Sequence, residues 1–85
     1  MSIAEIVEKY ISNAQQAFGQ IERSRQKDDA RNILDYAERY LEDALYYRSQ
    51  KRFEVALASV AYCEGLLDAL RLLEMVKFQW AKESQ

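Results

Sequence analysis

The sequence of 85 residues contains no histidine, no proline, two glycines and one cysteine. Without histidine, the common zinc, haem and di-iron ligand sets and the histidine-based nucleophile pairs are missing. Cys63 has no second cysteine to pair with, and its place on an apolar stripe indicates a small buried hydrophobe. We therefore expect no catalytic residues, no bound metal and no cofactor, and a protein that is not an enzyme.

The scarcity of glycine and proline leaves few residues for tight hairpin turns, which favours an all-helical chain. Hydrophobic residues make up 49% and charged residues 31%, a composition typical of one soluble domain spanning residues 1–85. The formal charge of −2 argues against nucleic acid as a partner. No uncharged apolar run reaches about 18 residues and the N-terminus does not resemble a signal peptide, so we expect a cytoplasmic protein without a membrane span.

Helical periodicity of apolar residues predicts helices at about 3–24, 30–49 and 53–82. Ser2 and Glu5 have the spacing of a capping box at the start of the first helix. The polar stretch 22–29 predicts the first turn, and the short stretch 49–52 predicts the second, which makes successive helices antiparallel neighbours. The expected fold is an all-α, antiparallel up-down-up three-helix bundle with a long third helix.

The stretch 53–80 is the longest apolar-rich run and has two apolar stripes on a helical wheel, whereas a surface helix normally has one. One stripe holds Phe53, Ala56, Val60, Cys63, Leu67 and Leu70; the other holds Val55, Ala58, Tyr62, Leu66, Ala69, Leu73, Val76 and Trp80. Gly65 is expected to permit close helix approach. The end of this long helix should extend beyond its neighbour, so its apolar residues need a cover, either the first turn of the chain or a second subunit.

Tyr36, Tyr40 and Tyr47 follow one flank of the second helix, in the same row as Asp43. We expect Asp43 and Asp68, the acids nearest the packed seams, to accept hydrogen bonds from Tyr36, Tyr40 or Tyr62 in a structural polar network rather than to act as an acid–base pair. Two basic clusters lie near the turns, one of Arg23, Arg25 and Lys27 and one of Arg48, Lys51 and Arg52. They are expected at opposite ends of the bundle, as solvated turns rather than as one phosphate-binding patch.

The second and third helices carry a recognisable set of residues, namely Asp43-Ala44, Phe53 with Ala56, Tyr62, Gly65 and Leu67-Asp68-Ala69. This set resembles the archaeal family called domain of unknown function 357. Lys51-Arg52 stands where that family favours Gly-Asp, and Cys63 replaces a small residue. The resemblance implies a small three-helix bundle and a cytoplasmic protein of archaeal type, and it brings no established activity. The spacing of Ala44, Tyr47, Phe53 and Ala56 is also similar to one tetratricopeptide hairpin, although arrays of these usually need three or more copies.

These features favour a non-enzymatic protein-interaction module that self-associates through its third helix, as a dimer, or that binds another helical protein. The expected interface anchors are large apolar residues, which carry most interface energy: Leu66, Leu73, Val76, Phe78 and Trp80. The alternative is a regulatory domain that binds a small ligand or RNA with the tyrosine row and one basic helix end.

Overall fold

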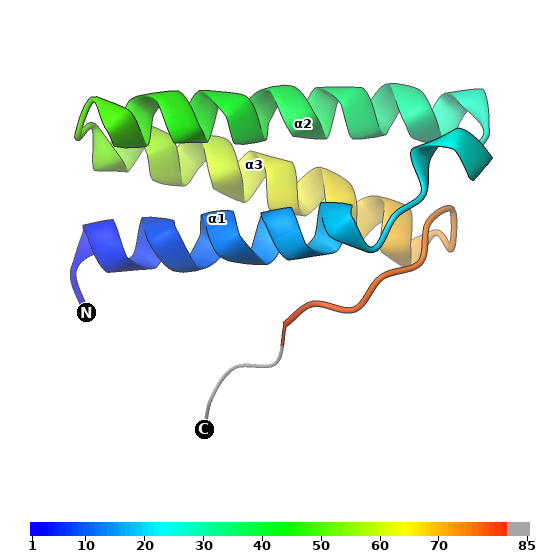
Figure 1. Ribbon diagram of the computed structural model, residues 1–85, viewed down its shortest axis with the longest axis horizontal. Coiled ribbons are helices and arrows are strands. Elements are labelled where there is room, and N and C mark those ends of the chain that lie inside the picture. The colour runs from blue at the N-terminus through cyan, green and yellow to red at the C-terminus, as the bar shows by residue number, and fades with distance from the viewer. Residues whose placement is uncertain (82–85) are drawn as a thin grey trace.

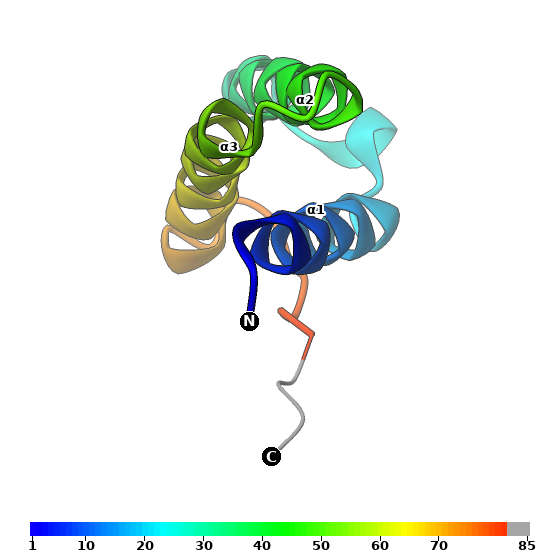
Figure 2. The same ribbon diagram turned by 90° about the vertical axis from the view of Figure 1, so that its left-hand side faces the viewer.

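The computed structural model describes residues 1–81, which form three α-helices and one short 3₁₀ helix. The helices are α1 (Ile3–Gly19), α2 (Asp28–Ser49) and α3 (Phe53–Leu72), and the 3₁₀ helix η1 (Arg23–Arg25) lies between the first two. Figure 1 shows successive helices running in opposite directions, and Figure 2 shows them grouped around a common centre. The predicted all-α three-helix bundle is confirmed.

The first helix begins at the predicted capping box. The Ser2 hydroxyl accepts a bond from the Glu5 amide and the Glu5 carboxylate accepts one from the Ser2 amide, both at 3.1 Å. The helix ends at Gly19 and not near Ser24, because glycine is a poor helix former. The chain then passes through η1, and α2 starts with Asp28 and Asp29 in its first turn, where carboxylates interact favourably with the helix dipole.

The turn between α2 and α3 has a left-handed residue at Lys51, with φ of 59°. The Lys51 amide donates to the carbonyl of Arg48 at 3.0 Å, and the Arg52 amide donates to that of Tyr47 at 2.9 Å. This pair of bonds is the Schellman pattern that terminates many helices, usually with glycine at the left-handed position.

The end of α3 repeats this pattern with another residue that is not glycine. Glu74 has φ of 60°, its amide donates to the Arg71 carbonyl at 3.0 Å, and the Met75 amide donates to the Leu70 carbonyl at 2.9 Å. The helix therefore stops at Leu72, and the predicted end near residue 82 is wrong. With 20 residues, α3 is also shorter than α2, which has 22.

Residues 73–81, here called the strap, turn back after α3. Figures 1 and 2 show the strap alongside α1, on the side of the bundle away from α2. Val76 is 3% exposed and Phe78 is 8% exposed, so both belong to the intramolecular core. The expectation that the apolar residues beyond Leu73 project past the bundle is therefore wrong, because the chain itself covers them.

The core is lined mainly by one face of each helix. From α3 it receives residues that are at most 1% exposed, namely Ala56, Val60, Cys63, Leu67 and Leu70. This set is the first of the two predicted stripes without Phe53, which is partly buried. Within residues 1–81, no helix combines the length and the apolar character needed to cross a lipid bilayer.

Candidate functional site

The side of α3 that faces away from the core is apolar and uncovered. Tyr62, Leu72 and Leu73 are 59%, 68% and 69% exposed. With the small residues between them they form what we call the open face: Ala58, Tyr62, Gly65, Ala69, Leu72 and Leu73, all exposed. Steps of three or four residues put them on one side of the helix, and they overlap the second predicted stripe.

Gly65 lies on this open face and does not pack against another part of the described chain. A Cβ atom built at Gly65 would meet no heavy atom within 4 Å. The close helix approach that we expected at this glycine therefore does not occur within the protein. Glycine inside a helix costs about 1 kcal/mol relative to alanine, and contacts within residues 1–81 do not account for it.

Aromatic residues border the open face where α3 meets α2. The rings of Tyr40 and Tyr62 stack with their centroids 4.5 Å apart at 28°. Tyr36 is 57% exposed, and the guanidinium carbon of Arg39 lies 5.4 Å from its ring centroid. Asp43 is exposed, and among the described residues it makes no hydrogen bond to a tyrosine. The tyrosines therefore pack by their rings, and the expected hydrogen bonds from their hydroxyls to aspartates do not form here.

Asp68, on α3, instead forms a hydrogen bond with the strap. Its Oδ1 accepts a bond from the indole Nε1 of Trp80 at 2.9 Å and two from Arg71, at 2.8 Å from Nη2 and 3.0 Å from Nε. The Trp80 bond, and then the Arg71 bond, lower the pKa of Asp68 because they favour the charged carboxylate. Sequence reasoning selected Asp68 and Trp80 for separate roles and did not pair them.

Glu64 lies one turn before Asp68 and experiences the opposite electrostatic effect. Burial raises its pKa, and the negative charge of Asp68 raises it further. The two carboxylates line an open hollow of about 510 Å³ together with Tyr10, Asn13 and Trp80. Within residues 1–81, the acidic side chains and Cys63 form no group of three or more that could hold a metal ion.

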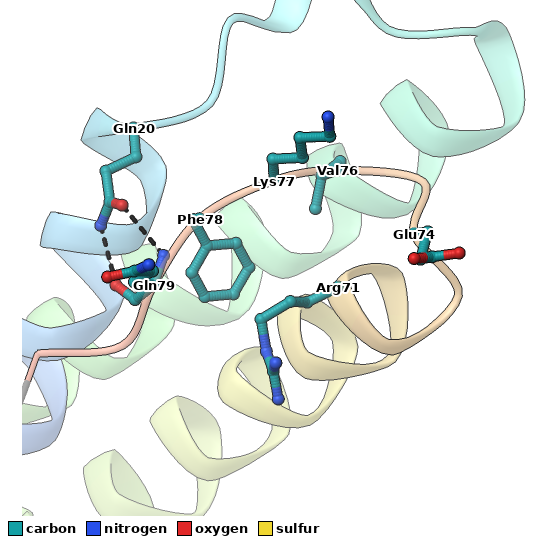
Figure 3. Close-up of a pocket in the computed structure, with 7 residues that line it drawn as sticks. All are labelled: Gln20, Arg71, Glu74, Val76, Lys77, Phe78 and Gln79. Carbon is teal, nitrogen blue, oxygen red and sulfur yellow. Dashed lines mark hydrogen bonds between the residues drawn. The ribbon is translucent and has the colours of Figure 1, made fainter.

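Gln20, at the end of α1, forms two hydrogen bonds with the backbone of the strap. Its Nε2 donates to the carbonyl of Gln79 at 2.9 Å, and the Gln79 amide donates to its Oε1 at 3.0 Å. Figure 3 shows both bonds, with Phe78 and Lys77 on opposite sides of the strap. The ring of Phe78 meets that of Trp80 edge-on with centroids 4.8 Å apart. The strap is therefore bound to α1 through its backbone and to α3 through a side chain.

Among the described residues, three of the six cations in the basic clusters at the two turns pair with carboxylates. The ion pairs are Arg23 with Asp35 at 3.5 Å and Glu38 at 3.1 Å, Arg25 with Glu22 at 3.0 Å, and Arg48 with Glu8 at 2.7 Å. Arg52 lies over the ring of Tyr47 at 5.2 Å. These contacts reduce the positive charge available to a phosphate.

Cys63 is buried, as predicted, and burial raises the pKa of its thiol to about 12. The thiol therefore stays protonated near neutral pH, when it is a poor nucleophile.

The five predicted interface anchors are divided between two surfaces. Leu73 is on the open face, and Leu66 is partly buried beside it. Val76, Phe78 and Trp80 are in the strap, where the first two are buried and Trp80 is partly buried. Sequence reasoning missed Gln20 and Arg71. A usable signal for the strap was the strict apolar–polar alternation of residues 76–80, which is typical of an extended segment with one buried side.

The comparisons with known proteins agree with the family resemblance. The sequence profile of the family described as protein of unknown function, DUF357, matches residues 9–76. No curated protein and no solved structure matches the chain. The match begins within α1, includes all of α2 and α3, and ends at Val76 in the strap. Since it covers well over half of the sequence, the chain belongs to the DUF357 family.

Proposed function

We infer that this protein is a non-enzymatic interaction module whose open face on α3 binds the same face of a second copy. One observation carries this proposal: Tyr62, Leu72 and Leu73 are each more than half exposed along one side of α3 and its C-terminal cap. Scattered apolar residues are normal on a surface, whereas a contiguous strip of them marks an interaction site. The unused glycine at position 65 adds to this, because it leaves room for another helix.

The open face is complementary to itself in an antiparallel arrangement. A two-fold axis between Gly65 and Leu66 places Ala58 opposite Leu73 of the second copy, Tyr62 opposite Ala69, and Gly65 opposite Leu66. Each pair joins one large and one small side chain, which is how packed helices interdigitate. A parallel arrangement in register would place Leu73 opposite Leu73. The antiparallel arrangement also gives the isologous interface of a two-fold dimer.

The size of the face sets the expected affinity. From Ala58 to Leu73 the helix rises by about 22 Å, so the contact lies near the lower limit of specific interfaces, about 1,000 Å² in total. We expect a dissociation constant in the micromolar range, about 1–100 μM, which corresponds to roughly 5–8 kcal/mol. Because the contact is apolar, salt should weaken it little.

Two tyrosines of nearly equal exposure provide a matched test. Tyr62 is 59% exposed on the open face, whereas Tyr46 is 60% exposed on α2. Each also contacts one other tyrosine ring. In sedimentation velocity from about 1 to 500 μM, a range set around the expected affinity, the wild type and Tyr46→Lys should dimerise and Tyr62→Lys should stay monomeric. Equal behaviour of the two variants, or a monomeric wild type, would reject the proposal.

Cysteine cross-linking tests the register separately. A mixture of Ala58→Cys and Leu73→Cys chains should form mixed disulfides under mild oxidation, whereas neither chain should cross-link to itself, because the two copies of each position lie far apart. Cys63 will not interfere because it is buried. Dimers that persist without this mixed cross-link would rule out the antiparallel register while leaving self-association in place.

Binding of a small ligand or RNA stays a prediction without a specific observation in its favour. The pairing of Arg23, Arg25 and Arg48 with carboxylates leaves less free charge for a phosphate. Melting-temperature shifts with nucleotide and RNA panels, compared for wild type and Tyr40→Ala, would test it.

A further inference from the structure

The strap contacts the bundle in the manner of a bound peptide. Its apolar side chains enter the core at alternate positions, Val76 and Phe78, while the next residue after each, Lys77 and Gln79, is exposed. Its backbone is bonded by the side-chain amide of Gln20 and not by a neighbouring strand. Peptide-binding grooves use this combination: backbone bonds supply affinity, and pockets for alternate side chains supply specificity.

The groove that holds the strap lies between α1 and α3, and its polar residues act on different parts of the segment. Gln20 binds one backbone amide and one backbone carbonyl, so it requires an extended chain but no particular side chain. Asp68, held in place by Arg71, accepts a bond from an indole N–H. The groove therefore fits a segment of the pattern apolar, any residue, aromatic, any residue, tryptophan.

The strap is joined to the groove by a short connection. Glu74 provides the reversal, in a left-handed conformation that residues other than glycine rarely adopt. The family match ends at Val76, so Gln20, Asp68 and Arg71 lie inside it, whereas Phe78 and Trp80 lie beyond it. The groove is thus part of the matched family domain, and the distal half of its occupant is not.

We propose that this groove is a docking site for an extended segment, and that its partner between molecules is the strap of a second copy of this chain. Every copy carries both the groove and a segment that fits it. An exchanged strap forms the same contacts as an intramolecular one, which is why exchange of an identical element is a low-cost route to a dimer. This contact uses Gln20, Asp68 and the strap, and is independent of the open face.

The two arrangements differ mainly in chain connectivity. An intramolecular strap has an effective concentration on the order of 1 mM, because its linker is short. The wild type therefore keeps its own strap at lower protein concentrations. Exchange becomes dominant when neither chain can dock its own strap but the strap of one chain can dock into the groove of the other.

Two complementary variants of the full-length chain create that condition. The groove-defective chain carries Gln20→Ala and Asp68→Ala and keeps its strap; the strap-defective chain carries Phe78→Ser and Trp80→Ala and keeps its groove. Both also carry Tyr62→Lys, which blocks the open face. Each chain alone should sediment as a monomer, and a mixture should form a 1:1 complex with one occupied groove.

Tryptophan fluorescence follows the same event. Trp80 is the only tryptophan, so in the mixture all emission comes from the groove-defective chain. Its emission should move to shorter wavelength on mixing, as Trp80 enters the partner's groove. A groove-defective chain that also carries Trp80→Ala is the control; its mixture contains no tryptophan, so it is followed by sedimentation, and it should form much less complex.

A second measurement covers the case in which a variant chain folds poorly or retains its own strap. A synthetic peptide with the sequence of residues 73–81 is titrated into the strap-defective chain, and binding is followed by peptide tryptophan emission and by recovery of helical circular dichroism. We expect saturable binding, weakened about 10-fold when Gln20→Ala is added. A mixture that sediments as separate monomers, together with a peptide that does not bind at millimolar concentration, would overturn the proposal.

Discussion

The strap and the open face of α3 both carry large apolar side chains, but these are buried in the strap and exposed on the open face. On the strap side, Val76 and Phe78 are 3% and 8% exposed. On the open side, Tyr62 and Leu73 are 59% and 69% exposed. Both sides carry large apolar groups in the sequence. The difference is that Val76 and Phe78 dock into the core of the bundle, while no described residue buries the side chains of Tyr62 and Leu73.

The comparison separates two roles that an apolar residue can have in a small domain. The buried strap residues Val76 and Phe78 stabilise the fold, because their side chains are removed from water in the monomer. Residues on the open face contribute little to the monomer and are available to a partner. The variants below test this separation, first where the expected effect is largest.

Replacing Phe78, the larger of the two buried strap residues, should have the largest effect on stability. Phe78→Ala should lower the free energy of unfolding by about 3–5 kcal/mol, as other buried phenylalanine truncations do. Tyr62→Ala on the open face should cost less than about 1 kcal/mol. Urea unfolding followed by circular dichroism, at concentrations low enough for monomers, measures both values. Similar costs for the two variants would mean that the open face is not open in solution.

Filling the unused glycine should act in opposite directions on the fold and on association. Gly65→Ala should stabilise the monomer by about 1 kcal/mol, since the added methyl group meets nothing within 4 Å and alanine favours the helix. The same methyl group should weaken self-association, because it occupies space meant for Leu66 of the second copy. Thermal unfolding measures the stability of the monomer, and sedimentation measures the dissociation constant of the dimer. A Gly65→Ala dimer as tight as the wild type would argue against close approach of the two helices at Gly65.

Acid should weaken the contact between the strap and α3 through Asp68. The lowered pKa of Asp68 means that its stabilising contribution is fully present above the unfolded value, near 3.8, and is lost as the pH falls through the folded value. The contribution is expected to be below about 1 kcal/mol because the carboxylate is partly exposed. Trp80 emission should shift to longer wavelength below about pH 4 in the wild type, and Asp68→Asn should remove this pH dependence.

Glu64 should show the opposite trend. Its pKa is raised above the usual value of 4.5, so the charged form is disfavoured in the folded state, and stability should increase as the pH falls through that raised value toward 4.5. Glu64→Gln should flatten this increase above pH 4.5. A wild type and a Glu64→Gln variant with parallel stability profiles would contradict the assigned environment.

The smallest effect is expected at the two left-handed helix ends. Lys51→Gly and Glu74→Gly each relieve a strained backbone of about 1 kcal/mol but add freedom to the unfolded chain. The net stabilisation should be a few tenths of a kcal/mol at each site. Glu74 forms the turn that leads into the strap, so relieving its strain should stabilise the docked strap. Glu74→Gly should therefore also slow hydrogen exchange at the amide of Gln79, whereas Lys51→Gly should leave that exchange unchanged.

The sequence predicted the parts of the fold that local chemistry specifies. The Ser2–Glu5 capping box, the core stripe of α3 and the short turn near Lys51 all follow from spacing within a few residues. The end of α3 could not be read in this way, because Glu74 takes a backbone conformation that normally requires glycine.

The candidate site was predictable only in part. Leu73 was selected from the second stripe as an interface anchor and lies on the open face. Tyr62, from the same stripe, also lies there but was selected as a hydrogen-bond donor to an aspartate. Val76 and Trp80 were selected from the same stripe because positions 73, 76 and 80 fit a helical period. Positions 76, 78 and 80 also fit the period of an extended segment, which is the conformation that the structure has. The contact of Trp80 with Asp68 decides between them, and it joins residues 12 positions apart through a chain reversal that no local signal announces.

Sedimentation equilibrium of the wild type over a wide concentration range, at low and high salt, tests the central claim most directly. The open face predicts a monomer–dimer equilibrium in the micromolar range that changes little with salt, and that the substitution Tyr62→Lys abolishes. A wild type that stays monomeric at every concentration would contradict the claim that the open face binds a second copy of this chain.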